Sequence, residues 1–311
     1  MRKREQLRDA LLGQKSMSNA LFHSPLTNSL KILNVHFEAE VGLRLNRMSC
    51  KRIDNHKPIE PNEIQLWWAS IAAIASLGEH YLTSHLGEQE AQSLNGLPSP
   101  RRHEFLATRV WIRALLSHYQ PLVMPNKWEF DSNAYGKPNV DCDLNGHRLD
   151  FNLSHSNGLI ICAFRLDHPV GVDIEVIRLL EDDWVDIART CFSPREVIEL
   201  MSHRKDDIPR RFTQYWTLKE AFIKAVGTGL SMPLKDFSMI IPSLEAIDSR
   251  LPTVSFTPKI SENSANWRFQ LLETAPGFQA AIAAKSDCKQ KLFVTQMGEF
   301  SMAADEVSLL K

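Results

Sequence analysis

Apolar residues recur at helical spacing in two long segments of the chain, 99–119 and 210–226. Ser99 and Pro100 are a start signal for the first segment, and Gly227 is an end signal for the second. The apolar faces comprise Phe105, Ile112, Leu115, Leu116 and Tyr119 in the first segment, and Phe212, Tyr215, Trp216, Phe222, Ile223 and Val226 in the second. The pattern predicts two long amphipathic helices, with shorter helices at 84–94 and 192–202.

Between and after these helices the pattern changes to short strands and turns. The pattern in segment 149–164 predicts two strands, with the polar stretch SHSNG as the turn between them. Further strands are predicted at the start of 64–75 and at 168–177, 235–241, 253–258, 266–272 and 278–284. Because a long helix followed by strands occurs twice, the sequence predicts an α+β protein with two similar halves.

The two ends of the chain differ from this plan. Residues 1–61 are polar and rich in Lys and Arg, and we expect an N-terminal extension with little fixed structure, in which a helix at 2–13 and a strand at 31–37 are the only elements indicated. We expect residues 291–311 to form a C-terminal tail.

Composition narrows the class of protein. The formal net charge of −1 gives no overall field that would select nucleic acid or a membrane surface. The five cysteines are scattered without a CxxC pair, which favours a reducing compartment over a disulfide framework or a zinc site. Since no apolar run approaches the roughly 20 residues of a membrane span, we expect a cytoplasmic protein.

Two carboxylates stand out in the strand VGVDIEV. Val172, Ile174 and Val176 share one apolar face, while Asp173 and Glu175 share the other, roughly 7 Å apart. Such a pair either faces water or holds a hard cation such as Mg²⁺. The spacing alone favours the wet acidic face.

The second long helix carries a lysine within its apolar arc. Lys219 lies between Trp216 and Phe222, where an isolated charge costs several kcal/mol, so its ammonium should reach water or an anion. Glu220 and Lys224 are four residues apart on one flank and could be an ordinary surface ion pair.

Polar residues elsewhere are also candidates for binding an anion. Ser154 and His155 could be a nucleophile and its base, but no GxSxG elbow is present, and we favour a phosphate contact. Arg102, Arg109 and Arg113 form a stripe on the first long helix, and their simplest interpretation is a solvated face.

Taken in order, these segments resemble one family. FNLSHS, VGVDIE, FSPREV and YWTLKEAFIKAVGTGLSMPL are similar to the 4′-phosphopantetheinyl transferase superfamily, in its larger surfactin-synthetase-activator type. The signature G-[IV]-D-x-E followed by W-x-x-K-E-[AS]-x-x-K is present without a departure, and YGKP at 135–138 matches the GKP motif. RRHEFLATR resembles the arginine-bearing helix, although the family usually reads A-G-R where this chain has Ala107-Thr108-Arg109. The resemblance covers about residues 62–290.

The resemblance implies an activity and a fold. Members move the phosphopantetheine arm of coenzyme A onto a serine of an apo acyl or peptidyl carrier protein and release 3′,5′-ADP. They are monomers with two pseudo-symmetric halves, each a small, mostly antiparallel sheet packed with a long helix, and the active site lies at the seam. The halves would be residues 62–164 and 165–290, the second carrying the metal site. The carrier could belong to fatty acid, polyunsaturated fatty acid, polyketide or non-ribosomal peptide synthesis.

The resemblance also implies roles for individual residues. Asp173, Glu175 and Glu220 would hold Mg²⁺ or Mn²⁺, and Glu220 would be the general base, directly or through a metal-bound water. The catalytic residues would then be Glu220, Lys224 and Asp173. The residues that would contact coenzyme A are Arg102, Arg109, Lys137, Ser154, His155, Lys219 and Lys224.

Two other functions remain open from the sequence. One is a binding module for coenzyme A or a carrier that keeps the fold without activity. The other is a different Mg²⁺-dependent phosphotransferase that uses the same carboxylates.

Overall fold

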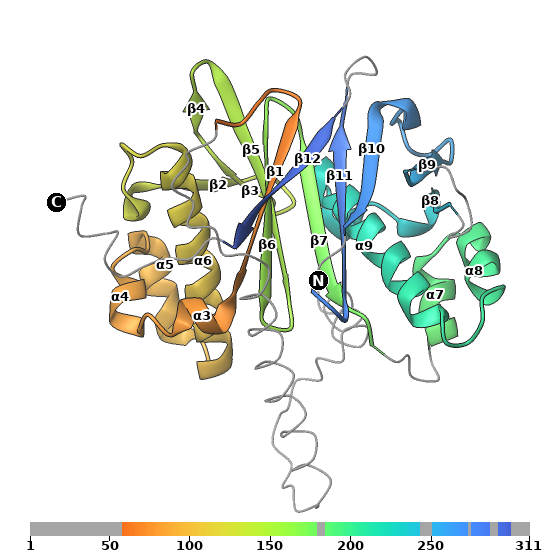
Figure 1. Ribbon diagram of the computed structural model, residues 1–311, viewed down its shortest axis with the longest axis horizontal. Helices are drawn as coiled ribbons and strands as arrows, with labels where there is room; N and C mark the ends of the chain where they lie inside the picture. The colour runs from red at the N-terminus through yellow and green to blue at the C-terminus, as the bar shows by residue number, and fades with distance from the viewer. Residues whose placement is uncertain (1–57, 179–183, 243–250, 273–274, 287–291, 300–311) are drawn as a thin grey trace, which may run out of the picture.

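The structure is a computed structural model that describes residues 58–178, 184–242, 251–272, 275–286 and 292–299 (Figure 1). The helix expected at 2–13 and the strand expected at 31–37 lie outside the described residues. Within them, none of the helices combines the length and the apolar character that crossing a membrane requires.

The N-terminal half places a group of helices against a five-stranded sheet (Figure 1). Its strand order is β12-β1-β6-β5-β4. The helices are α3 (Ile71–Ala75), α4 (Glu79–Thr83), α5 (Glu88–Ser93) and the long α6 (Ser99–Tyr119). The strands of this half are β1 (Glu63–Ser70), β4 (Asp143–Leu144), β5 (His147–Ser156) and β6 (Leu159–Leu166), with a separate hairpin of β2 (Phe130–Ser132) and β3 (Pro138–Val140).

The C-terminal half is built around a three-stranded sheet of order β10-β11-β7. Its helices are α7 (Trp184–Cys191), α8 (Pro194–Met201) and the long α9 (Ile208–Val226). Its strands are β7 (Val170–Val176), β10 (Trp267–Leu272) and β11 (Phe278–Lys285), with a hairpin of β8 (Phe237–Ile240) and β9 (Thr253–Phe256). Short 3₁₀ turns lie at Leu94–Gly96, Pro125–Lys127, Gly229–Ser231, Leu234–Asp236 and Ser264–Asn266.

The two halves repeat one topology. In each half a first strand is followed by a long helix, a small hairpin and later two more strands of the sheet. The sheet orders β1-β6-β5 and β7-β11-β10 correspond position for position. All four pairings within these trios are antiparallel. The predicted α+β class with two similar halves is confirmed.

Burial follows the predicted apolar faces. On α6, Leu115, Leu116 and Tyr119 are buried, and on α9 Phe222 and Ile223 are buried. A third apolar cluster joins the halves, because β1 and β6 contribute to it together with β7 and β11; its members include Ile64, Leu66, Ile161, Val172, Ile174 and Ile282. The two sheets therefore share one hydrophobic cluster at the interface between the halves, which is called the seam below.

The structure differs from the sequence-based expectations in two segments. The predicted SHSNG turn is shorter, because Ser154, His155 and Ser156 extend β5, and only Asn157 and Gly158 form the turn. Within the expected C-terminal tail, β12 (Phe293–Glu299) pairs in parallel with β1 at the edge of the N-terminal sheet. That pairing joins residues far apart in the sequence, and no local pattern announces it.

Candidate active site at the seam

Strand β5 carries a row of polar side chains that face β7. Asp150, Asn152, Ser154 and Ser156 occupy alternate positions and so project from one face of the strand. The carboxylate of Asp150 accepts a hydrogen bond from the backbone N–H of Val170 at 2.9 Å, and the amide oxygen of Asn152 accepts one from Val172 N at 2.9 Å. Through Asp150 and Asn152, β5 of the N-terminal half is hydrogen-bonded to the backbone of β7 in the C-terminal half.

The other two residues of this row, Ser154 and Ser156, contact the two candidate metal ligands of β7. The Ser154 hydroxyl donates to Asp173 Oδ1 at 2.8 Å, and the Ser156 hydroxyl donates to Glu175 Oε2 at 2.8 Å. Both carboxylates of VGVDIEV therefore face the N-terminal half, on the side of β7 that also contacts α9.

A glycine brings α9 close to this strand. A Cβ atom added at Gly171 would lie 2.1 Å from the carbonyl oxygen of Ala221 and 2.5 Å from the backbone nitrogen of Ala225. Any larger residue would force the helix away. The glycine of the G-[IV]-D-x-E motif thus allows backbone contact between strand and helix.

That contact lets Lys224 of α9 reach over the strand. Its ammonium lies 2.5 Å from Asp173 Oδ1 and 2.9 Å from Ser154 Oγ, and it also donates to the carbonyl of Val172 at 3.3 Å. Lys224 therefore joins a residue from each half at one point.

The other oxygen of Asp173 has no hydrogen-bond partner although it is buried. A buried carboxylate oxygen without a partner carries a desolvation cost of about 1–3 kcal/mol or more. Hard oxygen donors suit Mg²⁺, so the unpaired Asp173 Oδ2 fits a cation at this point.

The three predicted metal ligands do not form one preassembled shell. Among the described residues, no group of three or more His, Cys, Asp or Glu side chains is arranged closely enough to hold a metal ion. Glu220 lines the cleft described next, while Glu175 is held by Ser156. Asp173, Glu175 and Glu220 as a joint ligand set remain a prediction.

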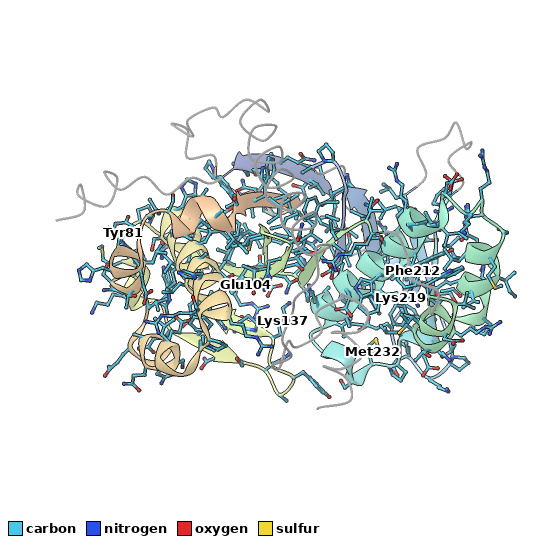
Figure 2. All side chains as sticks on the ribbon, turned by 90° about the horizontal axis from the view of Figure 1, so that it is seen from below. Tyr81, Glu104, Lys137, Phe212, Lys219 and Met232 are labelled. Atoms are coloured by element: carbon cyan, nitrogen blue, oxygen red, sulfur yellow. The ribbon has the colours of Figure 1, made fainter. Side chains whose placement is uncertain are left out.

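A cleft of about 390 Å³ opens at this seam. Its walls come from the turn between β2 and β3, from the end of β5 and from α9. The lining side chains that carry charge or polar groups include Lys137, Ser154, His155, Glu220 and Lys224. The structure thus brings together most of the residues predicted to contact coenzyme A, and Lys137 lies between the halves in Figure 2.

Lys219 is placed elsewhere. It lies among the helices of the C-terminal half (Figure 2), is 0% exposed, and pairs with a Glu196 carboxylate that is also 0% exposed, at 2.9 Å. Its ammonium donates to the carbonyls of Leu234 and Phe237, each at 2.7 Å. Burial lowers the pKa of Lys219, and the neighbouring Glu196 carboxylate opposes that shift. The prediction that Lys219 faces coenzyme A is wrong, because the protein itself supplies its anion.

The arginines of α6 are also engaged within their own half. Arg102 binds the Glu79 carboxylate and the carbonyl of Leu94. Arg109 lies 3.6 Å from Glu90 and over the Phe105 ring, and its side chain is about one third exposed. Neither arginine lines the seam cleft, so their predicted contacts with coenzyme A stay predictions.

His155 is oriented by α6. Its Nδ1 atom lies 2.9 Å from Glu104 Oε1, and the ring lines the cleft. A carboxylate on one ring nitrogen fixes the orientation of the ring, so the other nitrogen is held in place for contact with a phosphate.

Two features of the site were missed by the sequence analysis. Glu196 follows Ser193 by three residues, and the two form a capping box at the start of α8; this spacing is a visible helix-start signal, but it does not reveal the pairing with Lys219. The polar residues of β5 were also missed as a set. Their alternation from Asp150 to Ser156 is the signal that could have found them.

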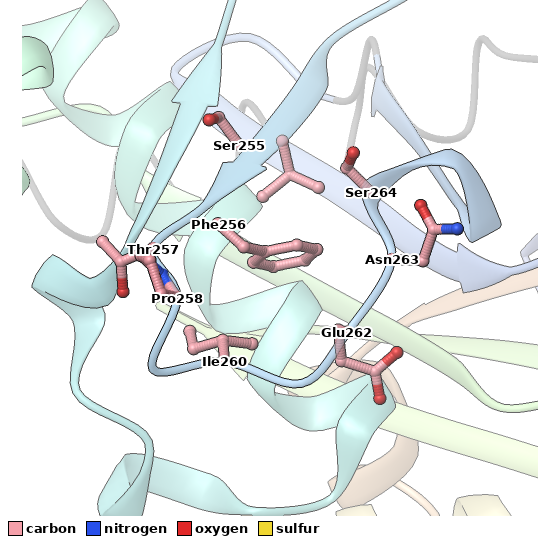
Figure 3. Close-up of a pocket in the computed structure, with 9 residues that line it drawn as sticks. Ser255, Phe256, Thr257, Pro258, Ile260, Glu262, Asn263 and Ser264 are labelled. Carbon is pink, nitrogen blue, oxygen red and sulfur yellow. The ribbon is translucent and has the colours of Figure 1, made fainter.

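A second hollow, of about 540 Å³, lies on the C-terminal half around β9 (Figure 3). None of its nine lining residues is basic, and its carboxylate, Glu262, is bound by Lys285 and by the indole N–H of Trp267. The seam cleft is therefore the better match for an anionic ligand.

A cleft with two lysines, three hydroxyl- or imidazole-bearing residues and nearby carboxylates suits an enzyme that binds a phosphorylated ligand together with a divalent cation. Comparison with known proteins identifies the family. The model of the 4′-phosphopantetheinyl transferase superfamily matches residues 169–283. The chain belongs to that superfamily.

Individual relatives agree with this assignment. The chain is 34% identical over 184 residues to 4′-phosphopantetheinyl transferase ffp of Bacillus subtilis, covering 58% of this chain and 74% of the relative. It is 28% identical over 217 residues to Sfp of Bacillus subtilis strain 168, covering 66% and 89%. It is 35% identical over 160 residues to gsp of Aneurinibacillus migulanus, covering 51% and 63%. The resemblance seen in the motifs is confirmed, and the protein is a 4′-phosphopantetheinyl transferase by family.

Proposed function

We propose that the protein transfers the 4′-phosphopantetheine group of coenzyme A to a serine of an apo carrier protein, in a Mg²⁺-dependent reaction that releases 3′,5′-ADP. The observation that carries the proposal is the meeting of Lys224, Ser154 and Asp173 across the seam, beside an open cleft. The cleft is built from both halves of one chain, so a single copy can form the whole site, which supports a monomer. The proposal also places the protein in the cytoplasm.

Charge complementarity supports coenzyme A as the ligand. Lys137 and Lys224 enter the cleft from opposite halves, and both carry ammonium groups suited to phosphate oxygens. Ser154 and His155 add a hydroxyl and an imidazole at the end of β5. In the proposal these four residues bind and orient the phosphates of coenzyme A.

The carboxylates have a separate role in the proposal. Asp173, Glu175 and Glu220 would hold the cation, which when bound would neutralise charge on the pyrophosphate. Asp173 is the best supported of the three because its Oδ2 atom is buried without a partner. Mn²⁺ would satisfy the same oxygen ligands.

The chemical step follows from the nature of the bond. The carrier serine oxygen attacks the phosphorus that bears the pantetheine arm, and the bond from that phosphorus to the 3′,5′-ADP oxygen breaks, with its electron pair leaving on the nucleotide. The serine proton passes to Glu220, directly or through water. Glu220 lines the cleft, so it is within the space where the serine must enter.

The carrier would dock beside the C-terminal half. Ile198 and Met201 are exposed on α8 at 71% and 52%, and Arg195 and Arg204 are exposed beside them. Apolar side chains with cations around them suit an acidic helical partner.

The test is the intact mass of purified apo carrier proteins after incubation with the protein, coenzyme A and Mg²⁺. The expected result is a gain of one phosphopantetheine that is lost when EDTA is added. Carriers from fatty acid, polyketide and peptide synthesis should be compared side by side. Coenzyme A binding without transfer to any carrier would favour a binding module, and no binding would overturn the proposal.

A variant pair tests whether Glu220 takes part in the reaction. Glu220→Gln should lower the rate of transfer by about 10²–10⁴-fold, the range for loss of a general base. The matched control is Glu88→Gln, at an exposed position on α5. A Glu220→Gln protein with near-normal transfer would remove Glu220 from the mechanism.

A further inference from the structure

The turn between β2 and β3 crosses the seam. It covers residues 133–137 and belongs to the N-terminal half, yet the Asn133 side chain donates from Nδ2 to the carbonyl oxygen of Gly227 at 2.7 Å. Gly227 ends α9 in the left-handed conformation, with φ at 79°. One amide group thus joins the turn to the end of the helix that carries Lys224 and Glu220.

The same side chain organises the turn itself. Asn133 Oδ1 accepts hydrogen bonds from the backbone N–H of Tyr135 at 2.9 Å and of Lys137 at 3.0 Å. The Asn133 backbone closes the turn as well, donating to the carbonyl of Lys137 and accepting from Gly136 N. An asparagine amide offers the acceptor and the donor that these two tasks need at once.

The turn presents Lys137 to the cleft. The Lys137 ammonium lies 3.3 Å from Asp150 Oδ2 and 3.3 Å from the carbonyl of Val170, at the start of the polar row on β5. Tyr135, Lys137 and Gly227 all line the cleft. The two walls therefore meet at the Asn133–Gly227 hydrogen bond, although Asn133 is not itself a lining residue.

Space around Gly227 is limited by this contact. A Cβ atom at Gly227 would lie 2.9 Å from Asn133 Nδ2 and 3.3 Å from Lys137 Cδ. The turn is thus seated against the helix end by close packing as well as by the hydrogen bond.

We propose that Asn133 is a positioning residue for coenzyme A: it holds the 133–137 turn against Gly227 and so fixes Lys137 at the seam cleft. The inference rests on the proposed function. Asn133 acts through Lys137 and does not touch the ligand.

The first test compares coenzyme A binding and transfer kinetics in wild type, Asn133→Ala and the control Ser132→Ala, which lies on the same hairpin. Asn133→Ala removes three side-chain hydrogen bonds that hold the 133–137 turn, and the looser placement of Lys137 should raise the Kd and the KM for coenzyme A about 5- to 30-fold. The kcat at saturating coenzyme A and the melting temperature should stay close to wild type, because Asn133 is exposed. A fall in melting temperature with unchanged Kd would show a merely structural role and overturn the proposal.

Two further variants sharpen the result. In a Lys137→Met background, Asn133→Ala should have little additional effect on coenzyme A affinity, because the residue it positions is gone. Asn133→Asp keeps the acceptor for Tyr135 N and Lys137 N but loses the donor to Gly227, so its affinity should fall between wild type and Asn133→Ala. Fully additive effects of the Asn133 and Lys137 changes would contradict the proposal.

Hydrogen exchange separates this inference from the proposed function. The Tyr135 and Lys137 amides should exchange faster in Asn133→Ala than in wild type, and this measurement needs no ligand. If wild type binds no coenzyme A, the proposed function fails, while the exchange rates still decide whether Asn133 holds the turn. Unchanged exchange at both amides would overturn the positioning role.

Discussion

The two halves share one topology but differ where the first strand meets the long helix. In the N-terminal half, β1 presents Trp67, whose indole N–H donates to the Tyr119 hydroxyl at 2.8 Å and whose ring lies 5.3 Å from that of His118 on α6. In the C-terminal half, β7 presents Gly171, and α9 approaches to backbone contact. A bulky side chain separates strand and helix in one half, and its absence in the other brings Lys224 onto Asp173.

The halves agree closely at another point. Each long helix buries one cation against one carboxylate, two backbone carbonyls and one aromatic ring. Arg113 binds Glu90, the carbonyls of Pro125 and Trp128, and lies over Phe130. Lys219 binds Glu196, the carbonyls of Leu234 and Phe237, and lies over Phe237. In both halves the cation fastens the segment after the helix back onto it.

This comparison separates framework from site. Arg113 and Lys219 serve the framework that the halves have in common. Gly171, Asp173 and Lys224 have no counterpart of this kind among the described residues of the N-terminal half. The site forms where these residues contact β5. A basic residue in a family motif is therefore not by itself a ligand contact, because its own half can supply the anion.

The largest predicted effect is a loss of stability when the buried cation that both halves share as a feature is removed. Lys219→Met should leave Glu196 buried without its partner and destabilise the protein by about 3–5 kcal/mol. Arg113→Met should also destabilise, but less, because Glu90 is partly exposed. Thermal unfolding measures both, and near-wild-type melting of either variant would end the analogy between the two cations.

A double variant checks the cause. Lys219→Met combined with Glu196→Met removes both charges and should recover much of the stability lost by Lys219→Met alone. Coenzyme A affinity of the folded fraction should remain close to wild type in this double variant. A large loss of affinity with stability restored would return Lys219 to the binding site.

The next effect tests the difference between the halves. Gly171→Ala should cost at least the upper end of the about 1–3 kcal/mol typical of overpacking, since its Cβ would meet the helix backbone. Coenzyme A affinity should fall with it, because α9 would carry Lys224 away from the seam. Gly96→Ala is the control, since a Cβ there meets nothing within 4 Å. Equal melting temperatures of the two variants would show that backbone contact at Gly171 is unimportant.

Much of this arrangement could be predicted from the sequence. Helical spacing gave both long helices, and motif order placed Asp173, Lys224 and Ser154 in one site, where the structure brings them together. The arc between Trp216 and Phe222 correctly put Lys219 on a buried face.

The rest depended on contacts that no local pattern encodes. Glu196 meets Lys219 only because α8 packs against α9 and β8, and periodicity within one helix carries no information about that packing. The parallel pairing of β12 with β1 has the same origin. The extension of β5 through Ser156 was missed because a polar run reads as a turn, whereas here each hydroxyl finds an acceptor on β7.

A third prediction concerns Lys224, whose ammonium contacts Asp173 Oδ1. Lys224→Met should raise Mg²⁺ affinity measured without coenzyme A, because the ammonium no longer competes for the carboxylate. The same variant should weaken coenzyme A binding about tenfold or more by loss of a charge-assisted contact. Calorimetric titration of each ligand separately measures both. Opposite changes support the assignment, and weaker binding of both ligands would mean that Lys224 only stabilises the fold.

The last comparison concerns one buried cysteine from each half. Burial raises the pKa of Cys142 in the N-terminal half to about 11, and burial followed by the Glu220 charge raises the pKa of Cys191, at the cleft, to about 11. The thiolate is the reactive form, so at pH 8 only about 0.1% of each thiol would be ionised, against about 10% for an ordinary cysteine. Alkylation by iodoacetamide should therefore be about 100-fold slower at both residues than in urea-unfolded protein, and should speed up as pH rises toward 11. Peptide mass spectrometry follows each site separately. If Cys191 alone reacted at the unfolded rate, the cleft wall at α7 would be open to solvent, and the close packing of the C-terminal half around α9 would not extend to this side of the site.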